Sequence, residues 1–124
     1  MFKLNYASLV LAISCLSACA VDPAAIGPYP SSYRDIVREA VLHSYYDPHS
    51  MRDVSISQPR AGLMDFQQGW IVCVEANARN RLGAYAGMQR TAYLIRKGEL
   101  AGQADGGGLC DAGLFYPWPD MEGR

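Results

Sequence analysis

Two histidines and two aspartates lie close together near the middle of the sequence, and their side chains are possible ligands for a metal ion. His43 and Asp47 are four residues apart, which places them on one face of a helix. His49 and Asp53 follow within a few residues. The chain has only 2 histidines, and a surface histidine paired with a helix-end carboxylate explains the same pattern. We favour this second interpretation and predict no metal ion and no other cofactor.

Other catalytic chemistry finds little support in the spacing of residues. The sequence has no Gly-x-Ser-x-Gly motif, which would mark a nucleophilic serine. Glu75 and Asp65 are carboxylates of the type that glycosidases use in pairs, but any domain of this size offers two carboxylates. The glycines at 106–108 lack the Lys and the Ser or Thr of a phosphate-binding loop. We therefore predict that the protein is not an enzyme.

The polar, glycine-containing stretch at residues 77–87 is the best candidate for a binding loop. Its candidate residues are Asn77, Arg79, Asn80, Arg81 and Tyr85. Asparagine forms side-chain-to-backbone turns and glycine allows positive φ, so a structured hairpin loop explains these residue types. Loops also carry function, and arginines displayed with a tyrosine would suit a polar or anionic partner such as a glycan. Both interpretations stay open.

The N-terminus has the pattern of an export signal. Lys3 and the free amine supply positive charge, and residues 4–16 are mostly apolar and carry no charge. This run is shorter than the roughly 20 residues that span a bilayer. A positive start, a short apolar run and small residues at its end are typical of a signal peptide that is removed.

The end of this signal is its most specific part. It contains Leu16-Ser17-Ala18-Cys19, which resembles the lipobox of bacterial lipoproteins over a region of some 20 residues. The resemblance implies that residues 1–18 are cleaved off and that Cys19 becomes the lipidated N-terminus. An ordinary signal peptide cut near Cys19 is the alternative. The alanine at position 20, where aspartate would favour the inner membrane, implies an outer-membrane protein facing the periplasm.

Residues 20–30 contain three prolines and almost no charge. Such a composition favours an extended tether, which would reach about 35 Å from the bilayer at 3.1 Å per residue. We therefore predict three parts: a signal peptide at 1–18, a lipidated N-terminus with a flexible tether at 19–30, and a single small domain at 31–124.

The chain has 4 cysteines, and the export signal decides their use. Cys15 would leave with the signal and Cys19 would be acylated, so Cys73 and Cys110 would remain in an oxidising compartment. We predict that these two form a disulfide, which would stabilise the domain by about 3–4 kcal/mol. A metal site or a reactive thiol pair is a weaker alternative, because neither cysteine has a neighbour at ligand spacing.

Composition limits the partners. The 11 basic and 12 acidic residues almost balance, giving a formal net charge of −1 at pH 7, so no basic excess favours nucleic acid. With 124 residues, the chain is long enough for one small domain with a core.

The elements that would hold these residues follow from periodicity and turn residues. A helix is expected to begin at Tyr33, after capping serines, and to end at Asp47-Pro48. Strands are expected at 52–58, 70–76 and 88–96, with a short edge strand at 100–104. Together these elements predict an α+β fold in which one N-terminal helix packs on a three- to four-stranded antiparallel sheet. The tail at 115–119 would not be helical, and either packs on this sheet or docks on a partner.

A second resemblance covers residues 33–97. An Asp-Pro-x-Ser sequence at 47–50 is followed by Cys73. After this cysteine come Asn77-Ala78-Arg79-Asn80 and a Gly-x-Tyr-x-Gly sequence at 83–87. This resembles small exported bacterial proteins of unknown function, which carry lysine where this chain has Arg79. The resemblance implies the fold and the exported setting, and it brings no known activity.

These observations predict a lipid-anchored cell-envelope lipoprotein with a non-enzymatic structural or binding role. Its partners would be the membrane, through the acyl chains, and an envelope protein or peptidoglycan. The alternative is a small envelope enzyme or an inhibitor of an envelope hydrolase.

Overall fold

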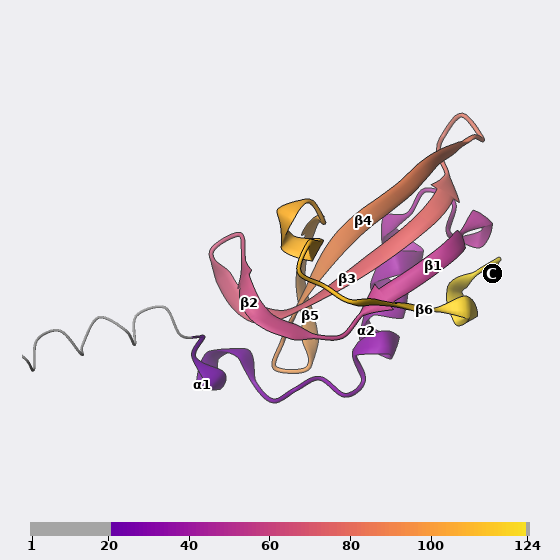
Figure 1. The fold of residues 1–124 in the computed structure, drawn as a ribbon. Coiled ribbons are helices and arrows are strands. Elements are labelled where there is room, and N and C mark those ends of the chain that lie inside the picture. The colour runs from indigo at the N-terminus through magenta and orange to yellow at the C-terminus, as the bar shows by residue number, and fades with distance from the viewer. Residues whose placement is uncertain (1–20, 124) are drawn as a thin grey trace, which may run out of the picture.

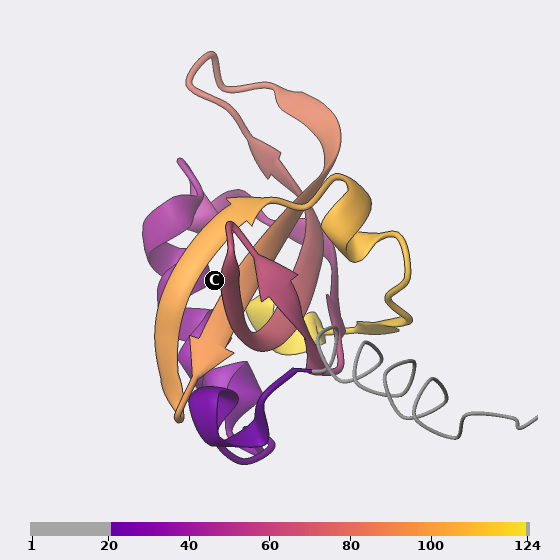
Figure 2. The same cartoon turned by 90° about the vertical axis from the view of Figure 1, so that its left-hand side faces the viewer.

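The computed structural model describes residues 21–123, which form one curved antiparallel sheet with two helices (Figures 1 and 2). The helices are α1 (Pro23–Ile26) and α2 (Tyr33–Ser44), and the strands are β1 (Arg52–Ser57), β2 (Arg60–Met64), β3 (Gln67–Arg79), β4 (Tyr85–Arg96), β5 (Glu99–Asp105) and β6 (Phe115–Pro117). Three short 3₁₀ turns are η3 (Pro48–Ser50), η4 (Gly108–Cys110) and η5 (Pro119–Met121). The α+β class is confirmed. The described part has six strands, however, and the prediction of three or four was too low.

The long strand β3 organises the sheet. In the order β5-β4-β3-β1-β6, it pairs with β4 along most of its 13 residues. On its other side it pairs with β2 near its start and with β1 near its end. We call the end that holds α1 and the turn at residues 65–66 the proximal end. The distal end holds η3 and the turn at residues 80–84, and it lies at the opposite corner of the molecule (Figure 1).

Helix α2 forms where the sequence predicted it. Its N-cap is Ser32, and Tyr45 ends it just before the Asp-Pro pair. Val37, Ala40 and Val41 lie at helical spacing and are buried against the sheet. The serine side chain makes no capping hydrogen bond; instead the backbone carbonyl of Ser32 accepts from the third and fourth helical amides.

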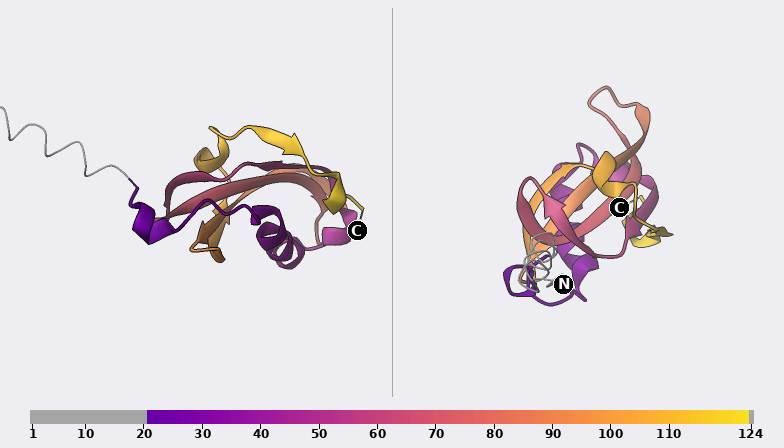
Figure 3. Two further views of the ribbon diagram at one scale, coloured as in Figure 1. Left: turned by 90° about the horizontal axis from the view of Figure 1, so that it is seen from below. Right: turned by 60° about the vertical axis from the view of Figure 1, so that its left-hand side comes forward.

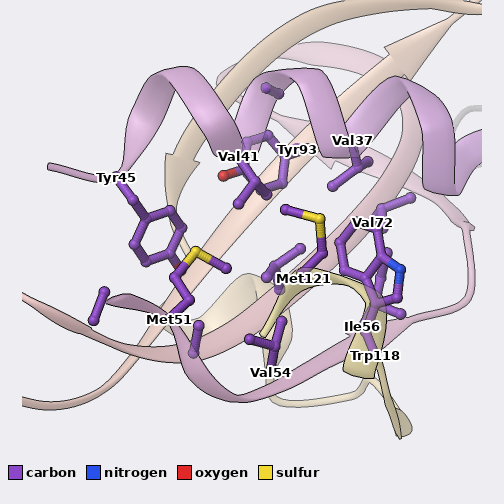
Figure 4. Close-up of a cluster of buried hydrophobic side chains, with 14 of the residues drawn as sticks. Val37, Val41, Tyr45, Met51, Val54, Ile56, Val72, Tyr93, Trp118 and Met121 are labelled. Carbon is purple, nitrogen blue, oxygen red and sulfur yellow. The ribbon is translucent and has the colours of Figure 1, made fainter. Parts of the chain in front are cut away.

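The main core lies between α2 and one face of the sheet (Figure 4). Residues from the helix, three strands and the C-terminal segment meet there, among them Val37, Val41, Met51, Val54, Ile56, Val72, Tyr93, Trp118 and Met121. Trp118 is fully buried, so the C-terminal tail packs on its own domain, as one of the two interpretations of the sequence expected. Strand β6 pairs with β1 and brings this tryptophan under the sheet.

The other face of the sheet has a smaller core. It contains Met64, Ile71, Cys73, Ala92, Leu94 and Cys110. The turn η4 lies on this side and α2 on the opposite side, as the left panel of Figure 3 shows. A disulfide joins Cys73 in β3 to Cys110 in η4, with Cα atoms 5.8 Å apart, as predicted. It fastens the segment after β5 across the middle of β3.

Two stretches that were not predicted as strands belong to the sheet. No strand was predicted between 58 and 70, but β2 runs through Gly62 in this interval and forms a hairpin with β3. The expected loop at 77–87 is much shorter, because β3 continues to Arg79 and β4 begins at Tyr85. Backbone pairing extends there, and of the added residues Ala78 is buried, Asn77 and Tyr85 are half-buried, and Arg79 is exposed.

The segment before α2 differs from the expected extended tether. The side chain of Asp22 accepts a hydrogen bond from Ala24 N, and Pro23 begins a short helix that buries Ile26 to 4% exposure. The carbonyl of Ile26 accepts from Lys97 N at 2.8 Å, which fastens α1 to the β4–β5 turn. The predicted signal at 1–18 and Cys19 lie outside the described residues. Within residues 21–123, neither helix has the length and apolar character to cross a membrane.

Candidate functional site

The turn at the distal end is built by Asn80. Its side-chain oxygen accepts from the amides of Leu82, at 2.9 Å, and Ala84, at 3.2 Å. Gly83 occupies the left-handed region with φ of 78°, where glycine is favoured. The side-chain oxygen of Asn80 is therefore used within the turn, which fits the interpretation of this stretch as a structured hairpin. Leu82, at the tip, is 91% exposed.

Tyr85 is the centre of a cluster just below this turn. Its hydroxyl donates to the carbonyl oxygen of Ser50 at 2.8 Å, which fixes the ring. The guanidinium carbon of Arg52 lies 3.5 Å from the ring centroid, and that of Arg79 lies 5.6 Å from it. Each of these arginine–tyrosine contacts is favourable by about 0.5–1 kcal/mol at an exposed site. The cluster holds two exposed guanidinium groups in defined positions.

Ser50 joins this cluster to η3. Its side-chain oxygen accepts from Arg79 N at 2.8 Å and donates to the carbonyl of Asp47 at 2.7 Å. The backbone of β3 is thereby connected to the end of the α2 region. Ser50 belongs to the Asp-Pro-x-Ser sequence noted above, so the motif was a signal for its role. Arg52 carried no comparable signal, and only strand pairing brings it opposite Asn77.

A shallow groove of about 510 Å³ surrounds the cluster. It is lined by Asp47, His49, Ser50, Met51, Arg52, Arg79, Tyr85, Glu122 and Gly123. The carboxylates of Asp47 and Glu122 balance the two guanidinium groups in formal charge, and Glu122 also accepts a hydrogen bond from Val54 N. The groove therefore offers donors and acceptors together and suits a ligand that carries both.

Arg81 and Asn77 lie apart from this groove. The guanidinium carbon of Arg81 lies 5.6 Å from the ring centroid of Tyr46, next to a second, smaller pocket of about 190 Å³. Asn77 is half-buried within β3, and its side-chain oxygen has no hydrogen-bond partner among the described residues. Of the five predicted loop residues, the structure brings Arg79 and Tyr85 together, and it joins Arg52 and Ser50 to them.

Two tyrosines, Tyr45 and Tyr93, are buried in the main core. The Tyr93 hydroxyl lies 2.8 Å from that of Ser44, and burial raises the pKa of Tyr93 to about 12. Burial also raises the pKa of Tyr45, and the nearby Thr91 hydroxyl partly offsets that rise. Both groups are neutral at physiological pH and belong to the core on which the site stands.

The other chemical candidates do not converge. The ring nitrogen Nδ1 of His43 lies 2.6 Å from the carbonyl oxygen of Glu39 in its own helix. Glu75 pairs with Arg90 at 2.5 Å, whereas Asp65 lies in the turn at the proximal end. Among residues 21–123, no three His, Cys, Asp or Glu side chains are placed to hold a metal ion together.

The disulfide is buried, since Cys73 and Cys110 are 2% and 1% exposed. Cys73 N also donates to the hydroxyl of Ser57, which is itself buried. Buried bridges of this kind are structural, because attacking thiols cannot reach them.

Comparisons with known proteins leave the site to be interpreted from its own geometry. No protein family, no curated protein and no solved structure matches this chain.

Proposed function

We propose that this chain is a lipid-anchored cell-envelope lipoprotein with a non-enzymatic binding role. In this proposal residues 1–18 direct export, Cys19 carries acyl chains in the outer membrane, and the domain faces the periplasm. The groove around Arg52, Arg79 and Tyr85 binds peptidoglycan or an envelope protein.

The observation that carries the proposal is the separation between the start of the domain and the groove. Asp22 N donates to the side chain of Gln68 at 2.8 Å, so the described chain begins beside the first residues of β3. The groove lies at the other end of this strand, which can span up to about 40 Å at 3.3 Å per residue. A membrane-attached protein needs its recognition surface on the side away from the anchor.

The chemistry of the groove supports peptidoglycan as a ligand class. Guanidinium groups bind carboxylates with paired hydrogen bonds, and peptidoglycan carries carboxylates on its peptides and hydroxyls on its sugars. The carboxylates of Asp47 and Glu122 can accept from hydroxyl or ammonium groups of the same polymer. The half-buried ring of Tyr85, with the guanidinium group of Arg52 over it, adds a planar polar surface that a sugar can contact.

The anchor is tested by replacing the acylated residue. In the proposal, Cys19→Ser abolishes acylation and moves the protein from the membrane fraction to the soluble fraction of the periplasm. Retention of the variant in the membrane fraction contradicts the anchor.

The groove is tested by co-sedimentation with purified peptidoglycan. Arg79→Ala combined with Tyr85→Ala removes one charge and the ring that fixes Arg52, and we expect binding to fall at least tenfold. Arg34→Ala is the control, since Arg34 is also exposed and also lies near a tyrosine ring, Tyr33. Equal capture of the double variant and the control would exclude the groove as the binding surface.

A further inference from the structure

The β2–β3 turn at the proximal end has an unusual composition. Asp65 and Phe66 both have positive φ, 47° and 66°, as the two central residues of a tight hairpin turn do. Asparagine and glycine are favoured at such positions, because larger side chains clash with the backbone there. Phe66 adopts this conformation and is 97% exposed, so contacts within the described molecule do not compensate for it. Leu63, in the same hairpin, is 53% exposed.

The turn lies beside the point where the described chain begins. Asp22 N is bonded to the side chain of Gln68, which is two residues from Phe66. Figure 2 looks at this end and brings α1 and β2 to the front. Cys19 is three residues before Asp22, so covalent geometry limits the distance between their Cα atoms to about 11 Å. Acyl chains on Cys19 would therefore place a bilayer next to this turn.

From these observations we infer that the β2–β3 turn is a second membrane contact, in which Phe66 and Leu63 enter the lipid interface beside the acylated N-terminus. The inference rests on the lipid anchor of the proposed function. It adds an orientation to that anchor, since two contacts fix how the domain stands on the membrane. The groove at the distal end then points away from the bilayer.

The charges at this end indicate how the contact works. Lys97 is exposed in the β4–β5 turn, while Asp22, Asp65 and Glu99 are acidic residues nearby. Because both signs occur together, the contact does not depend on anionic headgroups.

An aromatic pair also lies at this end. Tyr29 packs edge-on against Trp70, with ring centroids 5.4 Å apart, and is half exposed. Aromatic side chains of this type prefer the membrane–water interface.

The contact is weak, but it is strong enough to orient a protein that is already anchored. Burying one phenylalanine side chain favours the inserted orientation by about 10- to 100-fold. That is too weak to hold a soluble protein on a membrane, but it is enough to orient a protein that acyl chains already hold there.

The test uses the full-length lipidated protein, purified from cell membranes and reconstituted in phosphatidylcholine vesicles with or without bromine on the acyl chains. Phe66→Trp places a fluorescent reporter at the proposed contact. Leu82→Trp is the matched control, because Leu82 is almost equally exposed at the tip of the distal turn. The unaltered protein provides the signal of Trp70 and Trp118, which is subtracted from both.

We expect brominated lipid to quench the added tryptophan at position 66 at least twofold and to leave that at position 82 unchanged. Adding phosphatidylglycerol should not alter this result. Protein that floats with the vesicles but shows no added quenching at position 66 overturns the inference and leaves the anchor standing. Protein that does not float overturns both.

A second variant separates membrane contact from a structural role of Phe66. Asparagine accepts left-handed φ more readily than phenylalanine, so Phe66→Asn should raise the urea midpoint of unfolding. In the same vesicles, Phe66→Asn should reduce the quenching of a reporter introduced by Leu63→Trp. A lower urea midpoint would show that Phe66 is retained for the fold. Unchanged quenching would show that its ring does not hold the turn in the lipid. Either result would contradict the inference.

Discussion

The two hairpin turns at the ends of β3 both reverse the chain with residues at positive φ, but they use different residue types. The distal turn uses Asn80 to bind its backbone amides and Gly83 at positive φ, which are the residue types that turns favour. The proximal turn places Asp65 and Phe66 at positive φ and exposes an aromatic ring. The distal turn follows from turn chemistry alone. The proximal turn departs from that chemistry, and we infer that a membrane contact accounts for the difference.

The surroundings of the two turns differ in the same way. Arg52, Arg79 and Tyr85 line a groove with mixed charges beside the distal turn, and Arg81 lies near the ring of Tyr46 outside that groove. The proximal turn lies next to α1 and to the start of the described chain. In the proposed arrangement, β3 separates the attachment surface from the recognition surface, and a single core supports both ends of this strand.

The largest effect on stability is expected from loss of the disulfide, which joins η4 to β3 midway between the two ends. Replacing both cysteines, Cys73→Ala with Cys110→Ala, should lower the free energy of unfolding by about 3–4 kcal/mol, because the unfolded chain gains freedom. Urea unfolding measures this change. The reduced, unaltered protein is the control and should lose a similar amount. A loss below about 1 kcal/mol would show that the bridge between β3 and η4 contributes little to stability.

High pH should destabilise the main core that lies between the two ends. The folded pKa of Tyr93, about 12, is higher than the unfolded value of about 10, so its contribution is complete below pH 10. The contribution is lost as the pH rises from about 10 to 12, which lowers stability by about 2–3 kcal/mol. Unfolding measured across this range checks the prediction. Tyr93→Phe should flatten this part of the profile, and an unchanged profile would contradict the assignment to Tyr93.

Weakening the packing of α1 should lower stability and change the orientation of the proximal end on the membrane. Ile26→Ala removes its one buried side chain and should lower stability by about 2 kcal/mol, near the lower limit for a core isoleucine because the helix is peripheral. The same change should weaken the quenching at position 66 by brominated lipid, since α1 no longer holds the chain beside the turn. Ala24→Ser, at an exposed position of α1, is the control. Full quenching in Ile26→Ala would mean that α1 does not orient the domain.

The smallest effect is expected at the distal cluster. Tyr85→Phe removes the hydrogen bond to Ser50 and should lower stability by about 1 kcal/mol. The ring remains for Arg52, so peptidoglycan binding should persist. Tyr116→Phe alters an exposed tyrosine on β6 and should change neither property. Loss of binding in Tyr85→Phe would show that the hydroxyl, and not the ring, is the recognition element.

Much of the interior could be predicted because periodicity reports burial. The stripe on α2 and the alternation of Val54 and Ile56 in β1 are both confirmed. The disulfide followed from counting cysteines, since only Cys73 and Cys110 remained for an exported domain. Burial and covalent chemistry leave clear marks on a sequence.

The two ends could be predicted less well because their signals depend on distant contacts. The β2–β3 hairpin lacks the Asn-Gly or Asp-Gly pair that marks a two-residue turn. Gly62 resembles a strand breaker, but it lies opposite Gly69, and a side chain there would meet Ile71 at 2.9 Å. The prolines before α2 suggested an extended tether, although Pro23 is well suited to begin α1.

The most direct test of the whole account compares both turns in living cells. A photoreactive phenylalanine analogue is introduced at position 66 or at position 82, and the crosslinked material is identified by mass spectrometry. We expect lipid adducts from position 66, and adducts with peptidoglycan fragments or an envelope protein from position 82. The same products from both positions, or lipid adducts from position 82 alone, would contradict it.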